Sequence, residues 1–237
     1  MSGTRETERP LIAAIIPCYN GARYLADAIE SVLSQTYRPL EVIVIDDGST
    51  DGTPDVIRSF GGRIRSDRQR NVGVAAARNH GVRLATARFL SFLDADDLWP
   101  ADKLRLQMAA LESDTSLGLV TGYAEQFVSP ELPEVVRSRF AHVGEVLQAR
   151  VAGAMLVRRE DFERVGEFSA GLATGETIDW FLRAAEAGVR GVVLSNVVLR
   201  RRIHTTNHGI LQRDTRGDYI RIIKSALDRR REKARRT

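Results

Sequence analysis

The stretch Phe89-Leu90-Ser91-Phe92-Leu93-Asp94-Ala95-Asp96-Asp97 joins a run of strand-forming apolar residues to three carboxylates within four positions. A buried strand that delivers carboxylates to its end is costly unless a cation meets them there. Divalent metal ions prefer oxygen ligands, and ligands of α/β sheets bind at the carboxyl ends of the strands. The stretch therefore predicts a strand that ends at a site for a divalent metal and a phosphate-bearing ligand.

Apolar runs and helical spacings alternate on both sides of this stretch, which predicts an α/β fold with a doubly wound sheet flanked by helices. We expect strands at 11–16, 41–45, 62–69, 88–93, 117–127, 152–157 and 191–199. We expect helices at 21–35, 52–60, 72–87, 101–112, 160–165, 176–187 and around 219–227. Residues 128–150 carry two prolines and are expected to be irregular.

No repeat or linker divides the 237 residues, so we expect one domain at 11–215. A flexible segment at 1–10 should precede it, and a C-terminal helix and basic tail at 216–237 should follow. Cys18 is the single cysteine, which excludes an intramolecular disulfide and fits a reducing compartment. No apolar run approaches the roughly 20 residues of a membrane-spanning helix. These features favour a cytoplasmic protein, with peripheral contact at the inner face of a membrane left open.

The formal net charge of +4 is concentrated at the end of the chain, where Lys224 to Thr237 holds seven basic and two acidic residues. The rest of the chain is nearly neutral, which argues against sequence-specific nucleic-acid binding. Two interpretations of the basic segment stay open. It is either a solvated, partly disordered tail or an anchor for anionic lipid or an acidic partner.

Three predicted strands end in polar motifs, each of which taken alone could be an ordinary turn or helix cap. Together and in this order they are specific. The sequence resembles the family 2 glycosyltransferases of the GT-A fold over roughly residues 10–210. The hallmarks stand here as IIPCYNGARYL, EVIVIDDGSTDGT, NVGVAAARNHG and FLSFLDADDLWP.

The resemblance implies an inverting enzyme with a GT-A fold, a mixed sheet, a nucleotide-sugar donor and Mn²⁺ or Mg²⁺. The residues that match the family's donor site are Pro17, Tyr19, Asn20, Asp47, Arg78, Asp94 and Ala95. Asp96, the second acid of the Asp-x-Asp motif, and His204 match the positions that reach the metal. Gly153 and Ala154 resemble the segment beside the acceptor.

Glycosyl transfer by direct displacement also needs a carboxylate that takes the acceptor proton, far from the Asp94 cluster. Members of the family usually carry Glu-Asp at this point, with the Asp as base, but Thr177 stands in the Asp position. Glu176 is therefore our first candidate and Asp179 our second. Glu176 could instead be a helix-start acid favoured by the helix dipole, and Asp179 could pair with Arg183. Trp180 is a candidate acceptor-side ring, with core packing as the alternative.

Other functions compete with a glycosyltransferase that favours a UDP-sugar. A nucleotidyltransferase should carry a glycine-rich basic loop after the first strand, and a dinucleotide oxidoreductase a G-x-G-x-x-G there; neither is present. A zinc site at His204 and His208 lacks an obvious third ligand. A catalytically silent sugar-nucleotide-binding module stays open because of Thr177. The sugar and the acceptor, whether glycan, lipid carrier, peptide or small metabolite, cannot be named.

Overall fold

The computed structural model describes residues 9–132, 146–172, 174–204 and 216–236. Its centre is a mixed sheet of eight strands in the order β3-β2-β1-β4-β7-β5-β6, with β8 paired to β5. The bounds of the strands are β1 (Ile12–Cys18), β2 (Leu40–Asp46), β3 (Arg65–Arg68), β4 (Phe89–Phe92), β5 (Leu119–Val128), β6 (Val146–Ala149), β7 (Leu156–Arg158) and β8 (Gly191–Ile203).

The first half of the sheet is parallel and the second half is largely antiparallel. β1 pairs in parallel with β2 and β4, and β2 pairs in parallel with β3. β7 runs antiparallel to both β4 and β5, and β6 runs antiparallel to β5. The carboxyl ends of β1, β2 and β4 therefore lie together at one edge, as the sequence predicted.

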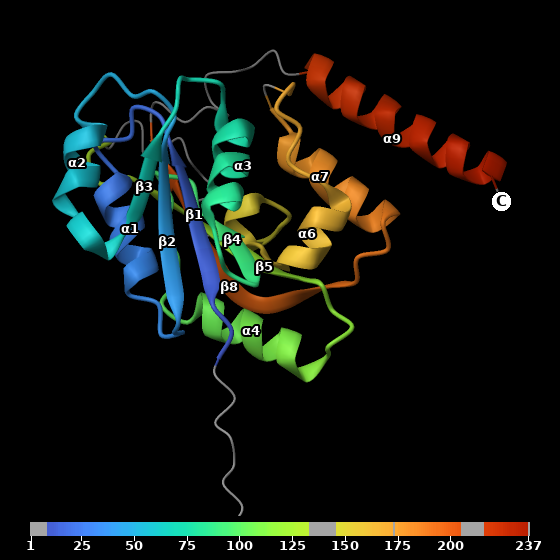
Figure 1. Ribbon diagram of the computed structural model, residues 1–237, viewed down its shortest axis with the longest axis horizontal. Coiled ribbons are helices and arrows are strands. Elements are labelled where there is room, and N and C mark those ends of the chain that lie inside the picture. Colours follow the sequence, from blue (N-terminus) through green and yellow to red (C-terminus); the bar gives the residue numbers. More distant parts are fainter. Residues whose placement is uncertain (1–8, 133–145, 173, 205–215, 237) are drawn as a thin grey trace, which may run out of the picture.

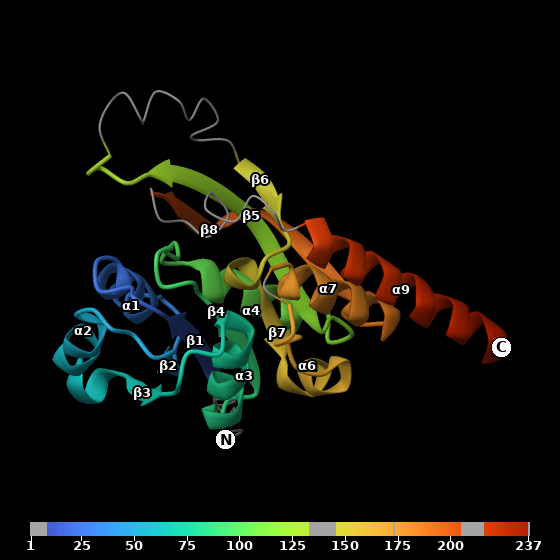
Figure 2. The same cartoon turned by 90° about the horizontal axis from the view of Figure 1, so that it is seen from above.

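Helices cover both faces of the sheet (Figures 1 and 2). One core contains residues of α1 (Leu25–Leu33), α2 (Thr53–Ser59) and α4 (Lys103–Ser113). The other contains residues of α3 (Val74–Leu84), α6 (Arg159–Val165) and α7 (Glu176–Glu186). β1 supplies both cores, because side chains alternate along a strand: Ile12 and Ile16 face the first core, and Ala13 and Ile15 the second.

α3 lies directly on the sheet because Gly81 leaves room for it. A Cβ at Gly81 would come within 2.4 Å of the Cγ2 atom of Ile15. The same core holds an aromatic cluster, in which Phe162 stacks on Trp180 with ring centroids 5.5 Å apart. This cluster joins α6 and α7 to β4 through Phe92.

The structure differs from the sequence prediction in several segments. β6 lies within 128–150, which we expected to be irregular, and residues 152–157 divide into the 3₁₀ turn η2 (Ala152–Ala154) and β7. A second 3₁₀ turn, η1 (Gly61–Arg63), overlaps the start of the expected strand 62–69, so that β3 begins only at Arg65. β8 runs four residues further than predicted because it stays paired with β5 as far as Ile203.

The two ends of the chain complete the comparison. The C-terminal helix, α9 (Arg216–Arg236), extends through the basic segment. Residues 1–8 of the predicted flexible segment lie outside the described residues. In the part of the chain that the structure describes, no helix is long and apolar enough to cross a membrane.

Candidate active site

The loops after β1 and β2 are joined by hydrogen bonds between residues about thirty positions apart. The backbone N–H of Asn20 donates to Ser49 Oγ at 2.9 Å, and Asn20 Oδ1 accepts from the N–H of Thr50 at 2.8 Å. The N–H of Gly21 donates to Thr53 Oγ1 at 2.9 Å. A Cβ at Gly21 would lie 3.5 Å from that of Ala95, so the loop after β4 meets the same point.

Asp47, the residue after β2, holds the loop that precedes α3. Its Oδ1 accepts from Gln69 Nε2 at 2.7 Å and from the N–H of Val72 at 3.0 Å. Its Oδ2 accepts from the N–H of Gly73 at 2.8 Å. A carboxylate oxygen accepts about two hydrogen bonds, and among the described residues Oδ2 accepts only one, so it has capacity for one more donor. Pro17 is buried in β1, whereas Tyr19 beside it has 46% of its surface exposed.

Arg78, on α3, connects the Asp-x-Asp motif to the start of α7. Its Nη2 donates to Asp94 Oδ1 at 2.6 Å and its Nη1 donates to Glu176 Oε1 at 2.6 Å. Burial lowers the pKa of Arg78, but the carboxylates of Asp94 and Glu176 raise it by more, so the pKa stays above its usual value. Asp94 and Glu176 are 82 positions apart in the sequence, and one guanidinium brings them together.

Asp96 lies beside His204, which follows β8. Asp96 Oδ2 and His204 Nε2 are 2.9 Å apart. The His204 ring is buried and packs on Tyr24 of the loop before α1, with ring centroids 4.6 Å apart. The next acid, Asp97, accepts from the N–H of Arg202 at 2.9 Å. Burial, with Asp96 and Asp94 nearby, raises the pKa of Asp97 well above its usual value.

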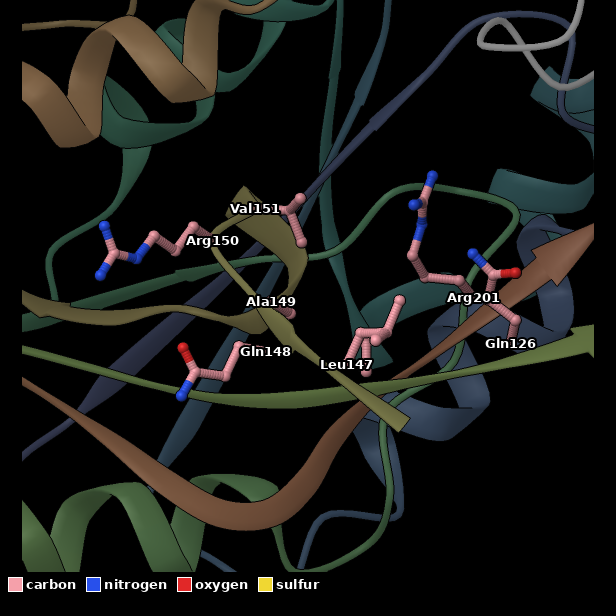
Figure 3. Close-up of a pocket in the computed structure, with 8 residues that line it drawn as sticks. Gln126, Leu147, Gln148, Ala149, Arg150, Val151 and Arg201 are labelled. Carbon is pink, nitrogen blue, oxygen red and sulfur yellow. The ribbon is translucent and has the colours of Figure 1, made fainter. Parts of the chain in front are cut away.

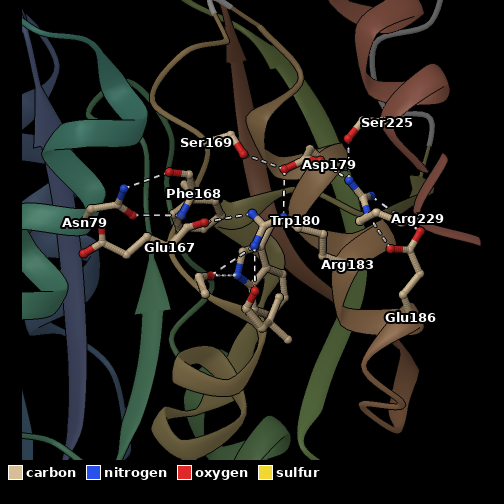
Figure 4. A network of polar contacts seen from close by, with 12 residues as sticks. Asn79, Glu167, Phe168, Ser169, Asp179, Trp180, Arg183, Glu186, Ser225 and Arg229 are labelled. Atoms are coloured by element: carbon tan, nitrogen blue, oxygen red, sulfur yellow. Dashed lines mark hydrogen bonds and ion pairs between the residues drawn. The ribbon is translucent and has the colours of Figure 1, made fainter. Parts of the chain in front are cut away.

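Glu176 and Asp179, the two candidate bases, are held by different partners. Glu176 Oε1 accepts from Arg78 and, at 3.2 Å, from Thr177 Oγ1. Asp179 Oδ2 accepts from Ser169 Oγ at 2.7 Å and from Arg183 Nε at 2.9 Å (Figure 4). Asp179 thus forms the structural pair with Arg183 that was one of its two interpretations. Of these two acids, and within the part of the chain that the structure describes, Glu176 alone is linked through Arg78 to the Asp-x-Asp motif.

Comparison with known proteins identifies the family. The sequence profile of glycosyl transferase family 2 matches residues 13–166, which is more than half of the chain. The chain belongs to glycosyl transferase family 2.

Relatives and solved structures agree with this assignment. An uncharacterized glycosyltransferase of Rickettsia felis is 30% identical over 186 residues, which are 73% of this chain and 31% of that protein. The present chain therefore matches about a third of that relative's length. A mannosyltransferase from Pyrobaculum calidifontis, solved with GDP-Man and Mn²⁺, matches with a TM-score of 0.69 at 23% identity. The match covers 94% of this chain and 65% of the mannosyltransferase chain. S. aureus TarS 1–349, solved with UDP-GlcNAc, matches with a TM-score of 0.67 at 18% identity. The match covers 83% of this chain and 60% of the TarS chain. The likeness to these structures confirms the GT-A fold.

Of the acceptor-side residues predicted for this family 2 chain, Trp180 requires a correction. Its side chain has no exposed surface, and its Nε1 donates to the carbonyl of Gly166 at 2.9 Å. The ring therefore belongs to the core and cannot stack on an acceptor. The apolar character that suggested a sugar platform serves the cluster with Phe162 instead.

Gly153 and Ala154 are buried in η2 and fix its backbone. The carbonyl of Gly153 accepts from Trp99 Nε1 at 2.9 Å, and that of Ala154 from Gln107 Nε2 at 2.8 Å. Val151, just before η2, lines a groove of about 140 Å³ together with Ala124, Gln126, Leu147, Gln148, Ala149, Arg150 and Arg201 (Figure 3). This groove, formed by the described residues, is smaller than a typical ligand pocket.

The residues present can bind a divalent metal if a bound ligand supplies the other atoms that coordinate it. No group of three or more His, Cys, Asp or Glu side chains in the described residues is arranged to hold a metal alone. Asp96 and His204 supply an oxygen and a nitrogen side by side, with the Asp96 side chain 32% exposed. Mg²⁺ is usually held by one or two carboxylates plus phosphate oxygens and water, and Asp96 supplies one such carboxylate here.

Sequence reasoning missed the residues that position the site. Arg202 ties β8 to the loop after β4 by donating to Asp97 and, through Nε, to the carbonyl of Asp96 at 3.0 Å. No local signal marks this contact, because the partners are more than one hundred residues apart in the sequence. Thr53 could have been found, since Asp51 followed two positions later by Thr is a common pattern for a hydrogen-bonded turn; Asp51 Oδ1 does accept from Thr53 Oγ1 at 2.5 Å.

Proposed function

We propose that this chain transfers a sugar from a nucleotide-diphosphate donor, with a UDP-sugar favoured, to an acceptor nucleophile with inversion at the sugar. The observation that carries the proposal is the Asp94–Arg78–Glu176 link. It joins the family's Asp-x-Asp motif to the one candidate base that faces it. The acceptor is a hydroxyl or another nucleophile on a glycan, a lipid carrier, a peptide or a small metabolite.

The donor's nucleotide is assigned to the loops that follow β1 and β2. Tyr19 offers an exposed ring against which a base can stack. Asp47 Oδ2 has one acceptor position left for a base or ribose group, and the neighbouring Asn20 fixes the loop that carries Tyr19. Pro17, Ala95 and Asp94 are assigned to the donor site as well, because they match the family's donor positions.

Glu176 is assigned as the base that receives the acceptor proton. Its Oε1 accepts from Arg78 and Thr177, whereas no hydrogen bond to Oε2 occurs among the described residues. Oε2 is therefore the atom that takes the proton. Asp179 ranks second because its contacts with Ser169 and Arg183 hold it away from this link.

Asp96 and His204 are assigned to Mn²⁺ or Mg²⁺, bound together with the donor diphosphate. When bound, such a metal stabilises the negative charge of the leaving diphosphate. The chain's own part is to hold the two ligand groups in place: Tyr24 packs on the His204 ring, and Arg202 fixes the backbone of the Asp96 loop.

The experiment is a thermal-shift screen of the purified protein against UDP-, GDP- and dTDP-sugars, each with Mn²⁺, Mg²⁺ or a chelator. We expect one nucleotide class to raise the melting temperature only when metal is present, and that donor to be slowly hydrolysed. Stabilisation without hydrolysis or transfer would favour the silent binding module that Thr177 suggests. No stabilisation by any sugar nucleotide would refute the proposal.

A further inference from the structure

One side of α9 is fixed against the body of the protein. Ile222 and Ala226 are buried there, and Arg229 donates to Glu186 of α7 at 2.5 Å (Figure 4). Asp218, also buried, accepts from the N–H of Thr174 at 3.1 Å. These contacts set the rotation of the helix about its axis, so the opposite side must face outward.

The outward side of α9 carries a stripe of large apolar residues, Ile220, Ile223 and Leu227, which we call the apolar stripe. Their exposed fractions are 66%, 58% and 46%. Residues three and four positions apart share one face of a helix, so the three form a continuous row. A helix that needed only its contact with α7 would carry polar residues here.

The charge of α9 is as unusual as its apolar stripe. The helix holds nine basic and three acidic residues, a formal +6, whereas the whole chain has +4. The remainder of the protein is therefore slightly negative. Lys224 and Arg235 are exposed on the helix that bears the apolar stripe. Positive charge and exposed apolar surface thus coincide on one element.

We propose that α9 is a membrane-surface helix that lies in the interface of a bilayer containing anionic phospholipid. A helix of this kind inserts its apolar face at the acyl boundary and places its basic groups among the headgroups. A second copy of the chain fits less well, because two helices of +6 would face one another. A nucleic acid would use the charge but leave the apolar stripe in water.

The position of α9 suggests why such contact is useful. Figure 1 shows that α9 begins near the amino-terminal end of α7, on the side of the sheet where the parallel strands end. Glu176 is the first residue of α7. Contact through α9 therefore brings the candidate site close to the bilayer surface.

The test is sedimentation of the full chain with phosphatidylcholine vesicles that do or do not contain phosphatidylglycerol. We expect binding to the anionic vesicles only, weakened as NaCl is raised because salt screens the attraction. The triple variant Ile220→Ser, Ile223→Ser, Leu227→Ser should lower the partition coefficient by at least about tenfold, since it removes apolar area from the contact. The matched control is Val146→Ser with Leu147→Ser, which removes similarly exposed apolar groups from β6 and should change nothing.

A second variant keeps the test independent of folding. Trp99 and Trp180 are both buried, so Leu227→Trp adds the one tryptophan that senses the surface, and its emission should shift to the blue with anionic vesicles. The proposal is overturned if the parent chain ignores anionic vesicles, if the triple variant binds as well as the parent, or if Leu227→Trp shows no shift. A concentration-dependent dimer that the triple variant abolishes would also overturn it. Donor binding should be the same in all these variants, which separates this proposal from the function proposed above.

Discussion

Glu176→Gln is the most informative substitution, because it removes a carboxylate and keeps the shape of the side chain. The Glu176 and Arg78 side chains are 11% and 4% exposed, so their ion pair is largely shielded from water. The glutamine carbonyl can still accept from Arg78 Nη1, and Asp94 still balances the guanidinium charge. The substitution therefore tests the basicity of the group without emptying its place.

The expected magnitudes follow from this geometry. Removing one partner of a buried ion pair outright costs about 3–5 kcal/mol. Here one charge-assisted hydrogen bond becomes a weaker one, so we expect a loss of about 1–2 kcal/mol. For a domain of this size that lowers the melting temperature by about 2–8 °C. The loss of a catalytic base should lower kcat by roughly 10²–10⁴, far more than the change in stability can explain at room temperature.

The assay measures kcat at saturating donor, together with the donor dissociation constant by calorimetry. The donor constant should stay within about threefold of the parent value, because Glu176 is assigned to the acceptor proton. Asp179→Asn is the matched control: it weakens the contacts with Ser169 and Arg183 and should leave kcat nearly intact. If Asp179→Asn loses activity and Glu176→Gln does not, the assignment of the two residues is reversed. If neither loses activity, the reasoning about a carboxylate base is wrong.

Three further substitutions test other parts of the structure. Asp96→Ala should abolish the metal-dependent part of donor binding. It should leave the melting temperature of the free protein almost unchanged, because this side chain is one-third exposed. A thermal-shift assay with donor and Mn²⁺ checks both results, and metal-dependent stabilisation that survives would contradict the assignment. Asp47→Ala should weaken donor binding more than tenfold, measured by calorimetry. It should also lower the free energy of unfolding by about 1–3 kcal/mol, since the N–H groups of Val72 and Gly73 lose their acceptor. An unchanged donor dissociation constant would exclude Asp47 from the donor site. Burial lowers the pKa of Lys103 well below 10.5, so the unfolded chain binds this proton more tightly and the free energy of unfolding should rise with pH up to about 10.5. Lys103→Met should flatten that rise in urea unfolding near pH 7 and pH 9, and an identical slope in both proteins would argue against a depressed pKa.

The parallel half of the fold could be predicted because local pattern and tertiary environment agree there. β1, β2 and β4 are largely buried, so their sequences are runs of mostly apolar residues that end at polar motifs. The Asp-x-Asp stretch could be placed at the correct edge of the sheet by the same argument.

The second half could not be predicted in the same way, because its strands are defined by their partners. The residues of β6 are largely exposed, and only pairing with β5 makes them a strand. Trp180 shows the same limit for a side chain. The sequence of an aromatic residue beside an acidic one is the same whether the ring faces a ligand or packs in the core. The partners of Arg78 and Arg202 come from distant elements, so the fold alone reveals which carboxylates they meet.

The Asp94–Arg78–Glu176 link has a thermodynamic consequence for the order of events at the site. One guanidinium divides its attraction between a carboxylate on the donor side and the candidate base. If a cationic ligand draws Asp94 away, Arg78 pairs with Glu176 alone. If Glu176 is protonated, Arg78 pairs with Asp94 alone. Binding at the two ends is therefore energetically coupled, and such coupling is reciprocal. The factor by which bound donor changes the affinity of Glu176 for a proton equals the factor by which that proton changes the affinity for the donor.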